Sequence, residues 1–145
     1  MYIMNTLLRY GSEDQKATYL PKIADGSLRL QAFGVSAPTS GTDTLSLKTR
    51  AVKDGNEYVI NGQKIWTSRA EHSDLMLLLA RTTPRDQVMK KTEGLSMFLV
   101  DMQQARGNGM EIKPIRTKMN HSSCEVIFDD LRIPATAIVG EEGKG

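Results

Sequence analysis

Apolar and polar residues follow a helical spacing up to about residue 30 and a strand-like spacing after it. Near the N-terminus, Ile3, Leu7 and Leu8 lie roughly one turn apart and predict a helix that begins without a capping residue. We therefore expect a short helical segment followed by a mainly β domain. The division is placed between residues 1–30 and 31–145.

A second helix is predicted to begin at Ser12. The sequence SEDQ is a capping box. In it the Ser12 hydroxyl accepts a hydrogen bond from the backbone amide of Gln15, and the Gln15 side chain accepts one from the backbone amide of Ser12. Pro21 is expected to break this helix, because proline lacks an amide hydrogen and clashes with the preceding turn. Gly26 is expected to end it.

Alternating apolar residues predict eight strands in the rest of the chain. They cover residues 31–36, 47–53, 57–60, 63–67, 75–81, 95–101, 110–116 and 125–133. Asp54-Gly55 and Asn61-Gly62 predict two successive hairpins, since asparagine, aspartate and glycine tolerate the turn's positive φ. Short strands at this spacing predict an antiparallel sandwich or barrel and not a parallel sheet.

The composition is that of an ordinary globular protein. The 145 residues carry a net charge of +2 from 19 basic and 17 acidic residues, which are interspersed. This balance, with 6% aromatic residues, argues against a nucleic-acid-binding barrel. The longest apolar run, residues 75–80, is too short to span a bilayer, and the N-terminus lacks the plan of a signal peptide. Because the chain starts inside a helix and ends in a glycine-rich loop, we expect a piece of a larger protein.

Cys124 is the only cysteine, which excludes a disulfide within the chain. We interpret it as a small buried hydrophobic residue. His121 and Cys124 have a ligand-like spacing, but a zinc site needs further ligands and only His72 remains among the histidines. No metal site is predicted.

Four segments carry possible chemistry. The segment AFGVSAPTSGTD, residues 32–43, is a strand running into a turn-rich loop whose amides could approach a polar ligand, although a plain surface loop would look the same. The others are NGQKIWTS, EVIFDDLRIPATAIVGEEGKG and GSEDQKATYLPKIADG. Together, and in the order in which they stand along the chain, they resemble the acyl-CoA dehydrogenase family. The resemblance covers the end of that family's N-terminal helical domain and its middle β-domain.

The resemblance implies that the strand containing the single tryptophan binds FAD. Trp66 would stack beside the flavin ring, and Ser68 would hydrogen-bond to flavin N5, the atom that accepts the hydride. Thr67 would contact the flavin through its backbone, because side chains alternate along a strand.

Further binding residues are implied in the earlier strand and loop. Phe33, Val35 and Ser36 match positions that offer donors to the pyrimidine edge of the flavin. Gly41 and Thr42 match positions near the pyrophosphate and the acyl-CoA entrance.

The implied reaction is α,β-dehydrogenation of an acyl-CoA thioester, in which the hydride passes to flavin N5. The family's glutamate base belongs to a C-terminal helical domain that no residue here matches, so no catalytic residue is assigned and the chain alone is expected to be inactive. The implied partners are an electron-transfer flavoprotein and further subunits of a homodimer or homotetramer. The implied compartment is the cytoplasm, or the mitochondrial matrix in a eukaryote. An acyl-CoA oxidase, a flavin monooxygenase of the same fold or a non-catalytic β interaction domain are the alternatives.

Overall fold

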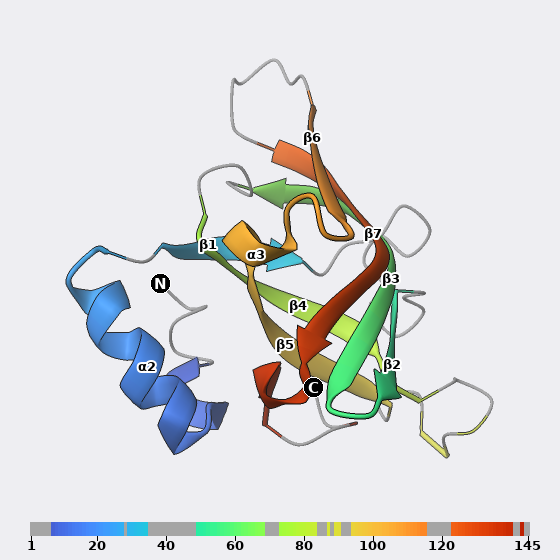
Figure 1. The fold of residues 1–145 in the computed structure, drawn as a ribbon, viewed down its shortest axis with the longest axis horizontal. Coiled ribbons are helices and arrows are strands. Elements are labelled where there is room, and N and C mark those ends of the chain that lie inside the picture. The colour runs from blue at the N-terminus through green and yellow to red at the C-terminus, as the bar shows by residue number, and fades with distance from the viewer. Residues whose placement is uncertain are drawn as a thin grey trace.

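The computed structural model describes residues 7–27, 29–34, 49–68, 73–83, 87, 89–90, 94–115, 123–140 and 143. Within this part of the chain the strands are β1 (Leu30–Gly34), β2 (Arg50–Asp54), β3 (Glu57–Ser68), β4 (Leu75–Arg81), β5 (Leu95–Asp101), β6 (Met110–Ile115), β7 (Ser123–Pro134) and β8 (Ile138–Val139). They form one sheet in the order β6-β7-β3-β2-β4-β5-β8, with β1 beside β4 (Figure 1). The prediction of a mainly β fold is confirmed.

Strand direction differs from the prediction in one respect. β1 pairs with β4 in parallel from Leu30 to Gly34, and β2 pairs with β4 in parallel where Arg50 meets Arg81. Both strands therefore lie along one edge of β4 and run parallel to it. β1 lies beside the first residues of β4, and β2 lies beside its last residue. The alternation of apolar residues indicates which face of a sheet a side chain occupies, but it does not indicate strand direction. The sequence therefore predicted an antiparallel sheet, whereas the sheet is mixed.

The predicted hairpin at Asp54 is confirmed, because Asp54 pairs with Glu57 across a two-residue turn. The hairpin predicted at Asn61-Gly62 is wrong. β3 continues through this dipeptide, and Asn61 lies in a bulge opposite two residues of β7. The side-chain nitrogen of Asn61 donates to the Asp130 carboxylate at 3.0 Å. The side-chain oxygen of Asn61 accepts from the backbone amide of Asp130 at 2.9 Å. The same residue types therefore bend a strand here, where they would otherwise reverse it.

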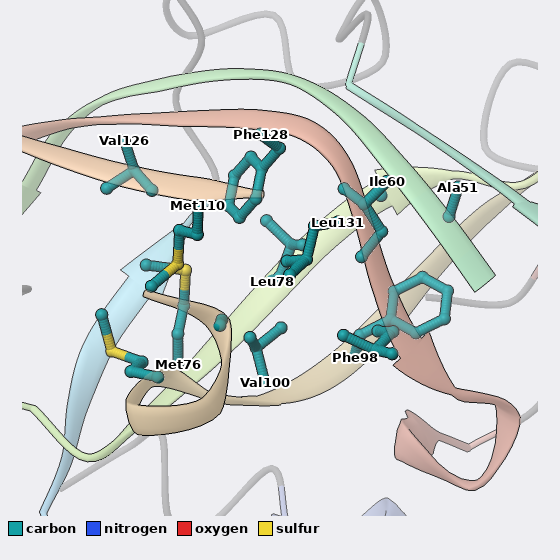
Figure 2. Packing of buried hydrophobic residues seen from close by; sticks show 14 of the residues in the cluster. Ala51, Ile60, Met76, Leu78, Phe98, Val100, Met110, Val126, Phe128 and Leu131 are labelled. Carbon is teal, nitrogen blue, oxygen red and sulfur yellow. The ribbon is translucent and has the colours of Figure 1, made fainter. Parts of the chain in front are cut away.

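The sheet curls around one apolar core. Figure 2 shows Met76 and Leu78 of β4 facing Phe128 and Leu131 of β7, two strands that are not neighbours in the sheet. This wrapping is the barrel-like feature that the sequence predicted. Cys124 is fully buried in the same core, as expected.

Helix α2 (Glu13–Ala24) covers the outer face of β4 and β5. Tyr19, Leu20 and Ile23 pack against a second cluster of Leu7, Leu75, Leu77, Leu99 and Val139. Because α2 lies on one face and the main core on the other, every residue of β4 is buried. Burial on both faces of β4 explains why residues 75–80 are continuously apolar.

The predicted start of α2 is confirmed. Ser12 is the N-cap, and both capping-box bonds to Gln15 form. The break predicted at Pro21 is wrong, since the helix continues to Ala24 and the Asp25 amide still donates to the Pro21 carbonyl. The apolar contacts of the helix on both sides of Pro21 offset the bond that the proline removes.

Short elements after β5 and β7 were not predicted. The one-turn helix α3 (Met102–Ala105) follows β5 directly and is capped by the Asp101 side chain. The turn η4 (Ala135–Ala137) leads from β7 into β8. A one-turn helix is too short for a periodic pattern to reveal it.

Candidate functional site

The fold brings β1 next to the second half of β3, although about thirty residues separate them in sequence. Gly34, at the end of β1, lies within contact distance of β3. A Cβ atom at Gly34 would lie 3.6 Å from Cγ of Lys64, 3.2 Å from Sδ of Met76 and 3.1 Å from Cδ1 of Leu78. The two tight distances are to side chains of β4, whereas the distance to Lys64 is that of ordinary van der Waals contact, so the end of β1 lies against both β4 and β3.

Both strands present backbone groups at this junction. β2 pairs with β3 only from Glu57 to Asn61, while β7 takes the opposite edge of β3 along its length. From Gln63 to Ser68, no strand of the described residues pairs with the other edge of β3, and β1 pairs only with β4. Unpaired strand edges carry N–H donors and C=O acceptors that a polar ligand can use.

The structure places four of the predicted cofactor residues in the two strands of this junction. Phe33 lies in β1, and Trp66, Thr67 and Ser68 lie in β3. Val35, Ser36, Gly41 and Thr42 lie outside the described residues. The two strands that the resemblance assigned to one ligand are therefore neighbours in space.

Thr67 faces the core side of β3. It is 1% exposed, it pairs with the buried Cys124, and its Oγ1 has no hydrogen-bond partner within the described part of the chain. A second bulge causes this orientation, because three steps from Lys64 to Thr67 match two steps of β7. An unsatisfied buried hydroxyl costs about 1–3 kcal/mol.

Lys64 is the functional candidate that the sequence reasoning missed. Its side chain is fully buried, on the core face of β3 opposite Val126. Burial lowers the pKa of the Lys64 ammonium to about 8, since low-dielectric surroundings disfavour the charged form. The signal was present in the sequence, because Lys64 keeps the even spacing of the inward-facing Tyr58 and Ile60.

A cleft of about 680 Å³ lies apart from this junction, between α2 and the end of β7. The Gln15 amide donates there to the carbonyl oxygens of Thr136 and Ile138, at 3.0 and 2.9 Å. Burial and the nearby Asp101 carboxylate raise the pKa of Tyr19 on the same wall. The described lining residues include none of the residues predicted to bind flavin or substrate.

The described residues contain neither a metal-binding cluster nor a membrane-spanning helix. No three histidine, cysteine, aspartate or glutamate side chains gather in a way that could hold a metal ion. No helix in this part of the chain is long and apolar enough to cross a membrane. Both histidines lie outside the described residues.

Comparison with known proteins shows what the chain is similar to over nearly its whole length. Residues 32–131 match the profile described as acyl-CoA dehydrogenase, middle domain. The short/branched chain specific acyl-CoA dehydrogenase of Rattus norvegicus is 40% identical over 99% of this chain and 32% of its own length. Acyl-CoA dehydrogenase FadE26 of Mycobacterium tuberculosis is 38% identical over 97% of the chain and 34% of its own length.

A solved structure agrees with these sequence matches. The acyl-CoA dehydrogenase of Geobacillus kaustophilus superposes with a TM-score of 0.88 at 33% identity, over 99% of this chain and 37% of that one. The chain therefore spans about one third of the length of the relatives that it matches.

Proposed function

Because this chain belongs to the acyl-CoA dehydrogenase family, we propose that it is the FAD- and acyl-CoA-binding middle portion of an acyl-CoA dehydrogenase. The observation that supports this most is the junction of β1 and β3, where Gly34 meets Lys64. Two segments that the family resemblance assigns to one flavin are held there by the same packing contact.

The groups present at the junction fit a flavin. Its pyrimidine edge needs hydrogen-bond donors and acceptors, which the edges of β1 and β3 that no described strand pairs with can supply. Its ring needs a flat apolar neighbour. In this proposal Trp66 lies beside the ring, Ser68 hydrogen-bonds to N5, and Thr67 contributes its backbone. Phe33, Val35 and Ser36 serve the pyrimidine edge. Bound FAD would supply a hydride acceptor at N5.

The substrate would enter beside the loop that follows β1. Gly41 and Thr42 are proposed to lie near the pyrophosphate and the acyl-CoA entrance. Removal of the α-proton requires a base within hydrogen-bond reach on the side of the substrate opposite to the flavin. None of the 145 residues is assigned this role, so the chain alone is proposed to bind without turnover.

Partners and compartment follow from the same family membership. An electron-transfer flavoprotein is the proposed acceptor of the electrons, and the parent protein is proposed to be a homodimer or homotetramer. The cytoplasm, or the mitochondrial matrix in a eukaryote, is the proposed location.

The visible absorption spectrum of the protein expressed from its full open reading frame tests this function. A yellow protein whose flavin bands bleach on anaerobic addition of an acyl-CoA would support a dehydrogenase, and repeating the addition in air would separate it from an oxidase. A colourless protein that takes up no added FAD would contradict the proposal and leave a β-domain that acts in binding alone. The 145-residue chain, assayed with an artificial electron acceptor, should show no turnover.

A further inference from the structure

The chain contains two Asn-Gly sequences, at Asn61-Gly62 and at Asn108-Gly109. This dipeptide is chemically labile, because glycine has no Cβ to hinder attack of its backbone nitrogen on the side-chain carbonyl carbon of the asparagine before it. The attack closes a succinimide ring and releases ammonia. In a folded protein it requires the asparagine side chain and the backbone around it to move, so the fold decides between the two sites.

Asn61-Gly62 is held firmly within β3. The side-chain nitrogen and oxygen of Asn61 both form hydrogen bonds with Asp130, at 3.0 and 2.9 Å. β3 pairs with β2 at Asn61 and with β7 at Gly62, and an added Cβ at Gly62 would lie 2.6 Å from Cα of Thr49. Ring closure at Asn61 would therefore have to break both side-chain bonds and bend a paired, closely packed strand.

Asn108-Gly109 lies in the turn that joins α3 to β6 (Figure 1). Asn108 is exposed and has a glycine on each side, Gly107 and Gly109, with φ of +77° and +113°. Its side-chain nitrogen donates to the carbonyl oxygen of Gln104 at 2.6 Å, a surface bond that water can replace. An exposed hydrogen bond in a glycine-rich turn thus holds Asn108, and it restrains the side chain less than Asn61 is restrained.

The packing of the turn requires the glycine that makes it reactive. An added Cβ at Gly109 would lie 2.7 Å from Cα of Leu131 and 2.9 Å from the backbone oxygen of Asp129. Both are backbone atoms of β7, which cannot move away without disturbing the sheet. The Asp129 amide also donates to the Gly109 carbonyl oxygen at 2.8 Å. A larger residue at position 109 would therefore disrupt the fold, so the labile sequence is tied to this turn.

We propose that Asn108 is a deamidation site of the folded protein and that Asn61 is protected by the fold. The backbone nitrogen of Gly109 attacks the side-chain carbonyl carbon of Asn108 and gives up its proton. The bond from that carbon to the amide nitrogen breaks, and the amide leaves with the proton as ammonia. Water then opens the succinimide at one of its two carbonyl groups, which leaves aspartate or isoaspartate at position 108. Water is the only co-reactant, and the step is independent of the proposed flavin site.

The product weakens the end of α3. A carboxylate at position 108 cannot donate to the carbonyl oxygen of Gln104, and its negative charge lies beside that oxygen. Isoaspartate also lengthens the backbone by a carbon atom, directly before Gly109 and its close contact with β7. Because α3 contributes Met102 and Ala105 to the main core, deamidation loosens a covering of that core.

The test follows both sites in one sample. The protein from its full open reading frame is aged at pH 7, folded or in guanidinium chloride, and then digested with trypsin. Peptides 54–64 and 107–116 each contain one Asn-Gly sequence, and fragment spectra locate the gain of about 1 Da that separates an acid from an amide. In the folded protein Asn108 should react at least about tenfold faster than Asn61, whose additional bonds must break first. In the denaturant the two rates should be similar.

Equal rates at the two sites in the folded protein would overturn the proposal, and so would an Asn108 that reacts in the denaturant alone. Asn108→Gln should abolish the mass gain in peptide 107–116, because glutamine closes a larger ring much more slowly. Asn108→Asp reproduces one product and should lower the equilibrium constant for folding about fivefold. Gln87→Glu, at an exposed position, is the matched control for the added charge. Equal stability of Asn108→Asp and this control would contradict the loosening of α3.

Discussion

The side-chain amide of Gln15 donates a hydrogen bond of 3.0 Å to the backbone oxygen of Thr136, 121 residues further along the chain. The same amide donates to Ile138, and its oxygen accepts from the Ser12 amide. One side chain thus caps α2 and fixes the helix to the segment after β7.

Gln15→Glu should destabilise the fold by about 2 kcal/mol, because a carboxylate keeps the cap but cannot donate to the two carbonyl oxygens. Urea unfolding of both proteins at pH 7 measures the difference. Gln87→Glu, at an exposed position, is the matched control and should change stability by less than about 0.5 kcal/mol. Equal stability of Gln15→Glu and wild type would show that the anchoring bonds contribute nothing.

Thr67→Val should stabilise the chain by about 1 kcal/mol, because it removes a buried hydroxyl that has no partner among the described residues and keeps the volume of the side chain. Thermal unfolding without FAD measures this. Thr136→Val, at an exposed position, should have little effect. FAD affinity should not change in Thr67→Val, since the proposed contact is through the backbone, and a weaker affinity would show that the hydroxyl itself binds.

The free energy of unfolding should rise with pH between about 8 and 10. In the folded chain Lys64 loses its proton near pH 8, whereas in the unfolded chain it keeps the proton to its ordinary value of 10.5. The unfolded state therefore binds more protons across this window, and stability increases as the pH rises, by up to about 3 kcal/mol. Above pH 10 the raised pKa of Tyr19 acts in the opposite sense.

The measurement for this pH effect is urea unfolding at intervals of pH, for wild type and for Lys64→Met. The variant should lack the rise, so the difference between the two proteins isolates Lys64 from every other titrating group. Parallel pH profiles in the two proteins would contradict the assignment.

Gly62→Ala should cost about 3 kcal/mol or more. Its φ is +149°, and an added Cβ would lie 2.6 Å from Cα of Thr49, a backbone atom that cannot move away easily. Gly55→Ala is the control, because Gly55 has a φ of +62° and nothing within 4 Å, so only backbone strain of about 1 kcal/mol is added. Similar losses in the two variants would show that the contact between Gly62 and Thr49 is unimportant.

Much of the fold could be predicted from the sequence because its signals are local. The capping box at Ser12 and the strands at residues 75–81 and 95–101 depend on neighbouring residues alone, and they were predicted with their observed limits. Strand direction and the path of β3 through Asn61 depend on β4 and β7, which lie far away in sequence. No local pattern distinguishes a bulge from a turn at Asn-Gly.

The candidate site shows the same difference between features set by neighbouring residues and features set by distant strands. The resemblance assigned β1 and β3 to one predicted ligand site, and the structure shows that the two strands are neighbours. The burial of Lys64 was missed because lysine on a strand is usually exposed. The second bulge, between Lys64 and Thr67, is set by pairing with β7, so the core-facing position of Thr67 beside Cys124 could be read only from the fold.

The covering of β4 by α2 has a consequence for synthesis on the ribosome. The helix is made early, but the carbonyl oxygens of Thr136 and Ile138 that hold it are among the last of its contacts to emerge. Contacts of such long sequence separation form late in folding. Leu75 and Leu77 of the nascent chain therefore present an apolar surface to chaperones until residues 136–138 have left the exit tunnel.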